Sequence, residues 1–240
     1  MTPLLLLLVA SQQQALPRAH SHNDYERSRP LEQAVELGFG SVEADVFLVN
    51  GELLVAHDRD KVDADKTLNR LYLKPIYERF SAGKHVPSIL LIDIKKDGAE
   101  AWRVLRKQLE PYRKMIGADK VQVVISGDRP KELIFNDIDH LTAYDGRASD
   151  LDLPEDARIP LISESWLSHF IWFGTGEMPE VQLSKLREMV GRAHKNKRKI
   201  RFWATPDKPA VWEVLHREGV DLIGTDNPEA LSEFLRSKTQ

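Results

Sequence analysis

The chain contains no cysteine, which excludes disulfides, thiolate metal sites and a cysteine nucleophile. It has no large excess of charge of one sign. With 34 basic and 37 acidic residues, its composition does not favour a nucleic-acid partner. The GxGxxG fingerprint of dinucleotide-binding folds is absent. The longest apolar run, Leu4 to Ala10, is too short to span a bilayer.

The first residues resemble a short signal peptide, because the apolar run is followed by small and polar residues. The usual Lys or Arg before such a run is missing. We expect residues 1–16 to be a signal peptide or disordered leader and residues 17–240 to form a single domain. This favours a secreted or periplasmic protein, with a soluble cytoplasmic protein as the alternative.

Short apolar runs alternate with amphipathic helical stretches along most of the chain. We expect strands at 18–21, 41–48, 53–57, 89–95, 121–126, 141–144, 160–163, 200–204 and 222–225. We expect helices at 31–37, 100–112, 130–136, 181–194, 210–217 and 229–236, with a less regular one at 67–80. This alternation is typical of parallel strands covered by outer helices.

Eight βα units favour an α/β fold of the single (β/α)₈ TIM-barrel type, with an open doubly wound sheet as the main alternative. Polar residues recur at the ends of the predicted strands, and a barrel gathers those ends on one face. With 240 residues and 42% hydrophobic residues, the chain can form one such core. We expect a monomer.

Three acidic residues fall on two neighbouring predicted strands. Glu43 and Asp45 are two positions apart in SVEADVFL, so they share one side of a strand, and Asp93 ends the strand SILLIDIK. Carboxylate oxygens suit Mg²⁺ or Ca²⁺, and one such ion would relieve the repulsion between these acids. The alternative is an ion pair of Glu43 with Lys95 or Arg18.

Two histidines lie near these acids, His20 after the first strand and His57 after a hairpin. Cleavage of a phosphodiester needs one group to accept a proton, another to protonate the leaving oxygen, and a cation to stabilise charge. Imidazole, with a pKa of about 6.5, can fill either protonic role. His20 and His57 are therefore the candidate catalytic residues, but which is the acid and which the base stays open, as does the role of His22.

These motifs resemble those of the glycerophosphodiester phosphodiesterase and phosphatidylinositol-phospholipase-C-like superfamily of TIM barrels. The matching segments are His20, LGFGSVEADV, LLVAHD, LLIDIK, FWATPD and GVDLIGTDNPEAL. The opening departs from the HRG motif of glycerophosphodiesterases, and AHSHNDYE is similar to the branch that includes fungal altered inheritance of mitochondria protein 6.

The resemblance implies a phosphodiesterase that cleaves a glycerophosphodiester or a phospholipid headgroup with one Mg²⁺ or Ca²⁺ ion. Its metal ligands would be Glu43, Asp45 and Asp93. Asn23, Lys95 and Trp203 would bind substrate. Three points stay open: which headgroup is cleaved, which of the two ions is used, and whether the reaction is hydrolysis or forms a cyclic phosphate.

Two other functions fit parts of the sequence. The pair His20 and His22 could begin a zinc site of the amidohydrolase or PHP type, with Asp226 as a further ligand. That site also needs histidines at the ends of the fifth and sixth strands, where AYDG and SES occur instead. The second alternative is a catalytically inactive barrel that binds lipid headgroups.

Two further stretches have structural and functional interpretations. The aromatic stretch Trp166 to Phe173 (WLSHFIWF) is more typical of a core helix than of a lip for transient membrane contact. The basic run Arg192 to Arg201 falls where a helix should end, so we expect a solvated helix terminus, with a phosphate or membrane contact as the alternative. We read Asp145 to Asp156 as a polar loop.

Overall fold

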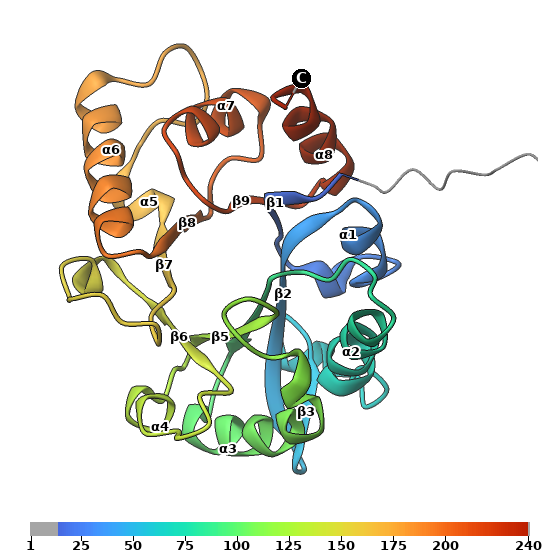
Figure 1. The fold of residues 1–240 in the computed structure, drawn as a ribbon. Coiled ribbons are helices and arrows are strands. Elements are labelled where there is room, and N and C mark those ends of the chain that lie inside the picture. Colours follow the sequence, from blue (N-terminus) through green and yellow to red (C-terminus); the bar gives the residue numbers. More distant parts are fainter. Residues whose placement is uncertain (1–13, 240) are drawn as a thin grey trace, which may run out of the picture.

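The computed structural model describes residues 14–239, which form a barrel of parallel strands with helices outside it (Figure 1). The strands are β1 Leu16–Ser21, β2 Phe39–Val49, β3 Glu52–Val55, β4 Ile89–Ile94, β5 Gln122–Gly127, β6 Ala143–Gly146, β7 Leu161–Ser165, β8 Lys199–Trp203 and β9 Ile223–Thr225. Around the barrel their order is β8, β7, β6, β5, β4, β2, β1, β9, with each neighbouring pair parallel.

The barrel closes between its last two strands. Arg201 on β8 pairs with Leu222, just before β9, in a parallel bridge. The backbone N–H groups of Asp221 and Leu222 donate to the carbonyl oxygen of Ile200 at 3.0 and 3.3 Å. The predicted (β/α)₈ barrel is confirmed, and β1 lies beside β9 as closure requires (Figure 1).

The helices follow the predicted order. They are α1 Glu32–Glu36, α2 Lys74–Ser81, α3 Gly98–Leu109, α4 Lys131–Phe135, α5 Trp166–His169, α6 Glu180–Lys195, α7 Pro209–Arg217 and α8 Pro228–Ser237. The irregular prediction at 67–80 resolves into a π-helical turn, Asn69–Leu73, followed by α2. The one-turn helix α5 lies within the aromatic stretch Trp166 to Phe173, where a core helix is expected.

A hairpin off the barrel brings His57 to the site. β3 pairs antiparallel with β2, with Val46 opposite Val55. Its turn is Asn50-Gly51, where both residues have positive φ angles of 50° and 85°, as a tight type I′ turn requires. The N–H of Ala56 then donates to the carbonyl oxygen of Asp45 at 3.2 Å, so the next residue lies beside that acid.

The inside of the barrel changes from apolar to polar along its axis. Ile89, Leu91 and Asp93 alternate along β4 and therefore share its inward face. The first two belong to a buried cluster with Val124, Leu161 and Leu222. Asp93 lies one layer nearer the carboxyl ends of the strands, so the polar layer is at the face where TIM-barrel sites form.

The aromatic stretch is divided between core and surface. Trp166, Phe170 and Trp172 are buried, as expected for core residues, whereas Ile171 is 81% and Phe173 50% exposed. The expectation of a core helix is therefore only half right, because α5 ends at His169, Phe170 has an extended backbone, and buried and exposed side chains alternate from Phe170 to Phe173.

The predicted leader, residues 1–16, lies mostly outside the described residues, so the division into leader and domain, and with it export, stays a prediction. Within residues 14–239 no helix has the length and apolar character needed to cross a membrane.

Candidate active site

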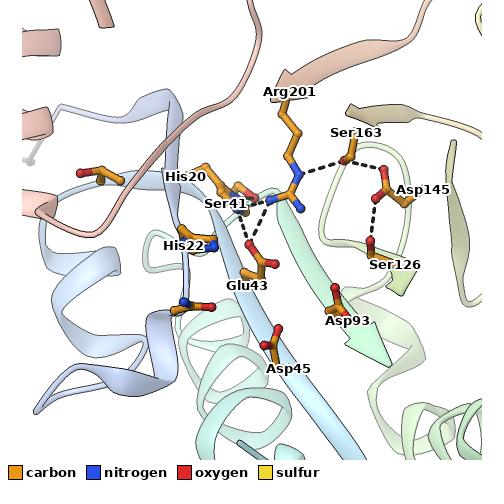
Figure 2. Close-up of polar contacts among 12 residues, drawn as sticks. His20, His22, Ser41, Glu43, Asp45, Asp93, Ser126, Asp145, Ser163 and Arg201 are labelled. Carbon is orange, nitrogen blue, oxygen red and sulfur yellow. Dashed lines mark hydrogen bonds and ion pairs between the residues drawn. The ribbon is translucent and has the colours of Figure 1, made fainter. Parts of the chain in front are cut away.

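Three acidic side chains meet in the polar layer of the barrel, as the sequence predicts (Figure 2). Asp45 on β2 is paired in register with Asp93 on β4, and Glu43 lies one inward position earlier on β2. Glu43, Asp45 and Asp93 each offer one oxygen, and these three oxygens lie within 4.8 Å of one another. Ca²⁺–oxygen distances are about 2.3–2.6 Å, so two ligands on opposite sides of one ion are about 5 Å apart.

The protein's own cations neutralise only part of this cluster. Lys95 Nζ lies 2.6 Å from Asp45 Oδ2 and 3.5 Å from Asp93 Oδ1. Arg201 Nη1 donates to Glu43 Oε2 at 3.0 Å. The ion pair considered for Glu43 with Lys95 or Arg18 is wrong. Arg18 instead donates to backbone carbonyls such as that of Val220, at the other end of the barrel.

One oxygen of the cluster is left without any partner. Asp45 Oδ1 is fully buried and makes no hydrogen bond within the described part of the chain. A buried carboxylate oxygen without a partner carries a desolvation cost of about 1–3 kcal/mol or more. Three oxygen donors at this spacing are the set that Mg²⁺ and Ca²⁺ prefer, so these residues fit a hard divalent ion.

The titration of the acids reflects the same imbalance. Burial, together with the charges of Asp45 and Glu43, raises the pKa of the Asp93 carboxyl despite the nearby Lys95. Glu43 differs from Asp93. Burial alone would raise the pKa of the Glu43 carboxyl, but the charge of Arg201 and the hydrogen bond between Glu43 and His20 outweigh burial and hold that pKa well below its ordinary value. Asp93 is therefore the acid that most lacks a compensating cation.

His57 lies at the open side of the cluster. Its Nδ1 is 3.1 Å from Asp45 Oδ2 and 3.3 Å from the hydroxyl of Tyr25, and its side chain is 47% exposed. The Tyr25 hydroxyl in turn donates to Asp45 Oδ2 at 2.7 Å, with Asn23 Oδ1 at 3.0 Å. These contacts hold the imidazole by Nδ1, and Nε2 has no hydrogen-bond partner among residues 14–239.

His20 is in a different environment, with an exposure of 1%. Its Nδ1 lies 2.8 Å from Ser41 Oγ, and its Nε2 lies 2.9 Å from Glu43 Oε2 and 2.6 Å from Arg201 Nη1. Burial and the charge of Arg201 lower the pKa of His20 to about 4, so the imidazole is neutral near pH 7. Both of its nitrogens are already engaged.

A cavity of about 90 Å³ opens beside His20 and His22. His20, His22 and Trp203 line it, and Trp203 is 44% exposed. His22 Nδ1 lies 2.9 Å from Asp226 Oδ1 at the end of β9. Three larger cavities, of about 600, 470 and 450 Å³, have none of these residues in their walls and are not part of the site.

Three features of the site were not predicted from the sequence. Tyr25 supports Asp45 and His57 from the turn that follows β1. Asp145, expected in a polar loop, lies on β6 and is fully buried. Arg201 falls both in the basic run expected at a solvated helix end and in the strand expected at 200–204; the helix ends at Lys195, and Arg201 lies on β8 and is buried. An arginine between Ile200 and Phe202 in a buried strand was the available signal.

Two family profiles and several curated proteins match the chain. The profile of the AIM6-like phosphodiesterase domain matches residues 11–87, and that of the glycerophosphoryl diester phosphodiesterase family matches residues 199–229. A homolog of altered inheritance of mitochondria protein 6 from Arthroderma benhamiae is 28% identical over 88% of this chain and 81% of its own length. The protein of that name from Eremothecium gossypii is 29% identical over 91% of this chain and 69% of its own length.

A solved structure has the same fold. The crystal structure of a glycerophosphodiester phosphodiesterase from Parabacteroides distasonis superposes with a TM-score of 0.62, covering 93% of this chain and 98% of that one at 18% identity. At that identity the likeness concerns the barrel alone. The two family matches and the relatives support assignment of the chain to the glycerophosphodiester phosphodiesterase-like superfamily and to its AIM6-like branch.

Proposed function

We propose that the chain is a phosphodiesterase that cleaves a glycerophosphodiester or a phospholipid-headgroup phosphodiester with one Mg²⁺ or Ca²⁺ ion. Glu43, Asp45 and Asp93 would hold the ion. The observation that carries the proposal is the buried oxygen Asp45 Oδ1, which lacks a partner beside two other acids. When bound, such an ion supplies positive charge to the phosphoryl oxygens and lowers the pKa of a bound hydroxyl or water.

The charge of the site supports an anionic substrate. Three carboxylates opposed by Lys95 and Arg201 leave the site with one net negative charge. The charges of Asp93 and Asp45 outweigh burial and raise the pKa of Lys95, so this cation stays charged. One divalent ion would change the net charge to plus one, which complements the single negative charge of a phosphodiester.

His57 is the better placed of the two proton-transfer candidates. Asp45 and Tyr25 orient its Nδ1, which leaves Nε2 for the attacking or the leaving oxygen. This is the arrangement of an acid–base histidine held by a carboxylate. A neutral His57 would accept the proton of the nucleophile, and a charged one would protonate the leaving alkoxide.

His20 would be the second group of the pair. It is neutral at physiological pH and can accept a proton, but its Nε2 now contacts Glu43 and Arg201. It therefore acts on substrate only if Nε2 exchanges one of these contacts for the reacting oxygen. Lys95, Asn23 and Trp203 lie around the same layer and would bind the rest of the substrate.

The zinc amidohydrolase alternative receives less support from the geometry. Within residues 14–239, only Glu43, Asp45 and Asp93 form a group of three potential ligands close enough for one ion. Neither His20 nor His22 belongs to it, since His20 contacts Ser41 and Glu43. The inactive-barrel alternative is disfavoured because both histidines and all three acids are present.

The test is a phosphorus-NMR screen of glycerophosphodiesters, lysophospholipids, sphingomyelin and phosphatidylinositol. Each substrate is incubated with metal-stripped protein, and then with added Mg²⁺ or Ca²⁺. We expect one class to be cleaved only after the ion is added, and the product signal separates a phosphomonoester from a cyclic phosphate. A His57→Asn preparation guards against a contaminating hydrolase. Absence of turnover with both ions across all classes would contradict the proposal.

A further inference from the structure

Arg201 is an unusual residue for the inside of a barrel strand. It is the third of five residues of β8, with Ser163 on β7 and Leu222 as its strand partners. Its exposure is 4%, although a guanidinium has five N–H donors that all require partners when buried. Neighbouring charges keep it ionised, because Glu43 and Asp145 outweigh burial and raise its pKa.

A chain of hydrogen bonds fixes the guanidinium from one side (Figure 2). Arg201 Nε donates to Ser163 Oγ at 2.8 Å, and the Ser163 hydroxyl donates to Asp145 Oδ1 at 2.7 Å. The second oxygen of Asp145 accepts from Ser126 Oγ at 2.8 Å and from Arg147 Nη1 at 2.9 Å. Because Asp145 accepts at both oxygens, the serine that supports Arg201 has little freedom to turn.

On the other side of the guanidinium, one terminal nitrogen reaches the polar layer that contains Glu43. Arg201 Nη1 contacts Glu43 Oε2 and His20 Nε2, as described above. The other terminal nitrogen, Nη2, makes no hydrogen bond to any described residue and is not sealed from solvent. Arg201 also lines the 90 Å³ cavity together with His20 and Trp203. A buried, rigidly held guanidinium therefore has unused donors at the site.

The charges of Asp93 and Arg201 also influence each other, so the guanidinium interacts electrostatically with the acids proposed to bind the metal. Without the positive charge of Arg201, the site with its ion would be neutral instead of carrying one positive charge. A planar guanidinium is well suited to phosphoryl oxygens, because its N–H groups form a fork of fixed geometry.

We propose that Arg201 is a substrate-contacting residue that donates through Nη2 to a non-bridging phosphoryl oxygen. This inference rests on the proposed function and adds a phosphoryl ligand to it. Ser163 and Asp145 act as positioning residues that hold the donor in place before substrate arrives. A preorganised donor of this type typically contributes about 10²–10³-fold to turnover.

The test compares two buried arginines. Arg201→Lys keeps the charge but loses the fork, and Arg198→Lys is the matched control. Arg198 is equally buried, but it donates to the carbonyls of Leu153 and Pro154, outside the site. With Mg²⁺ present, calorimetry should show that Arg201→Lys binds inorganic phosphate at least about tenfold more weakly, whereas Arg198→Lys binds it like the unmodified protein. Turnover of the phosphodiester found in the screen should fall about 10²-fold in Arg201→Lys alone.

A second variant covers the case in which Arg201→Lys does not fold. Ser163→Ala leaves the guanidinium and its charge in place but removes its support, and it should reduce phosphate affinity and turnover by about threefold to tenfold, roughly the effect of one hydrogen bond. If Arg201→Lys folds and binds phosphate as tightly as the unmodified protein, the inference is overturned and the proposed function stands. If only Ser163→Ala folds, unchanged phosphate affinity in that variant has the same meaning. Unmodified protein that binds phosphate through Arg201 but cleaves no phosphodiester would instead overturn the function.

Discussion

Asp45 and Asp93 are register partners on β2 and β4. Lys95 is the only lysine or arginine of the described chain within 4 Å of either carboxylate. Two inward carboxylates on adjacent strands repel each other at close range, and one lysine does not neutralise both. The layer is therefore strained electrostatically in the absence of an ion, with direct consequences for stability.

Asp93→Asn should stabilise the metal-free protein. The pKa of Asp93 is raised, so its ionisation above the unfolded value of 3.8 opposes folding at neutral pH. Removing the charge should raise Tm by about 2–4 °C for a gain of about 1 kcal/mol. The same change should abolish stabilisation by Mg²⁺ or Ca²⁺ in a thermal melt. Asp60→Asn, at an exposed site, is the control and should change neither; a lower Tm for metal-free Asp93→Asn would contradict the expectation.

His57→Asn should reduce turnover by about 10²-fold or more, as expected for loss of a positioned acid or base. Because His57 Nδ1 contacts Asp45 and is not a member of the acidic cluster, stabilisation by the ion should persist. His140→Asn is the control, since His140 is exposed and Asn tolerates its positive φ of 48°. The measurement is steady-state kinetics on the substrate found in the screen. Full activity of His57→Asn would show that His57 has no catalytic role.

Tyr25→Phe should weaken binding of the ion. Burial and the charge of Asp45 raise the pKa of the Tyr25 hydroxyl, so it stays a donor to Asp45 at every working pH. Loss of a hydrogen bond to a charged group costs about 1.5–3 kcal/mol, which corresponds to about tenfold or more in affinity. Tyr112→Phe removes a comparable bond, to Asn69, outside the site. Equal Mg²⁺ affinities of the two variants by calorimetry would count against Tyr25 as a support.

His22 should titrate above 6.5. Burial alone would lower its pKa, but the hydrogen bond to Asp226 and the charge of Glu43 outweigh it. A raised folded-state pKa means that protonated His22 stabilises the fold below about 6.5, and that this contribution is lost as pH rises through the folded pKa. Proton NMR of the imidazole signals measures this directly. Asp226→Asn should lower the pKa of His22 and leave that of His216 unchanged; a His22 value below 6.5 in the unmodified protein would contradict the assignment.

The strands and the acidic cluster could be predicted because they depend on local pattern. A buried strand such as SILLIDIK has a clear apolar run, and the alternation in EAD determines that Glu43 and Asp45 share a side. The βα order then places neighbouring strands together, so the meeting of these acids with Asp93 follows from topology.

The rest of the site depends on contacts that no local pattern encodes. Tyr25 reaches Asp45 because the turn after β1 is held by the buried Asp24, which accepts hydrogen bonds from Ser21, the N–H of Leu31 and Tyr72. Composition could not distinguish Arg201 from the other cations of the basic run, of which Lys195 and Lys197 are exposed and Arg198 is buried outside the site. The Arg201 side chain points into the barrel because barrel closure pairs Arg201 with Ser163 on one side and with Leu222 on the other.

The most direct test of the central claim is a calorimetric titration of metal-stripped protein with Mg²⁺ and with Ca²⁺, alongside Asp45→Asn. The account predicts one ion bound per chain for at least one of the two cations, and no binding at this site in the variant, because the buried Asp45 Oδ1 is then no longer a carboxylate oxygen. Absence of binding to the unmodified chain, or the same binding by Asp45→Asn, would contradict it.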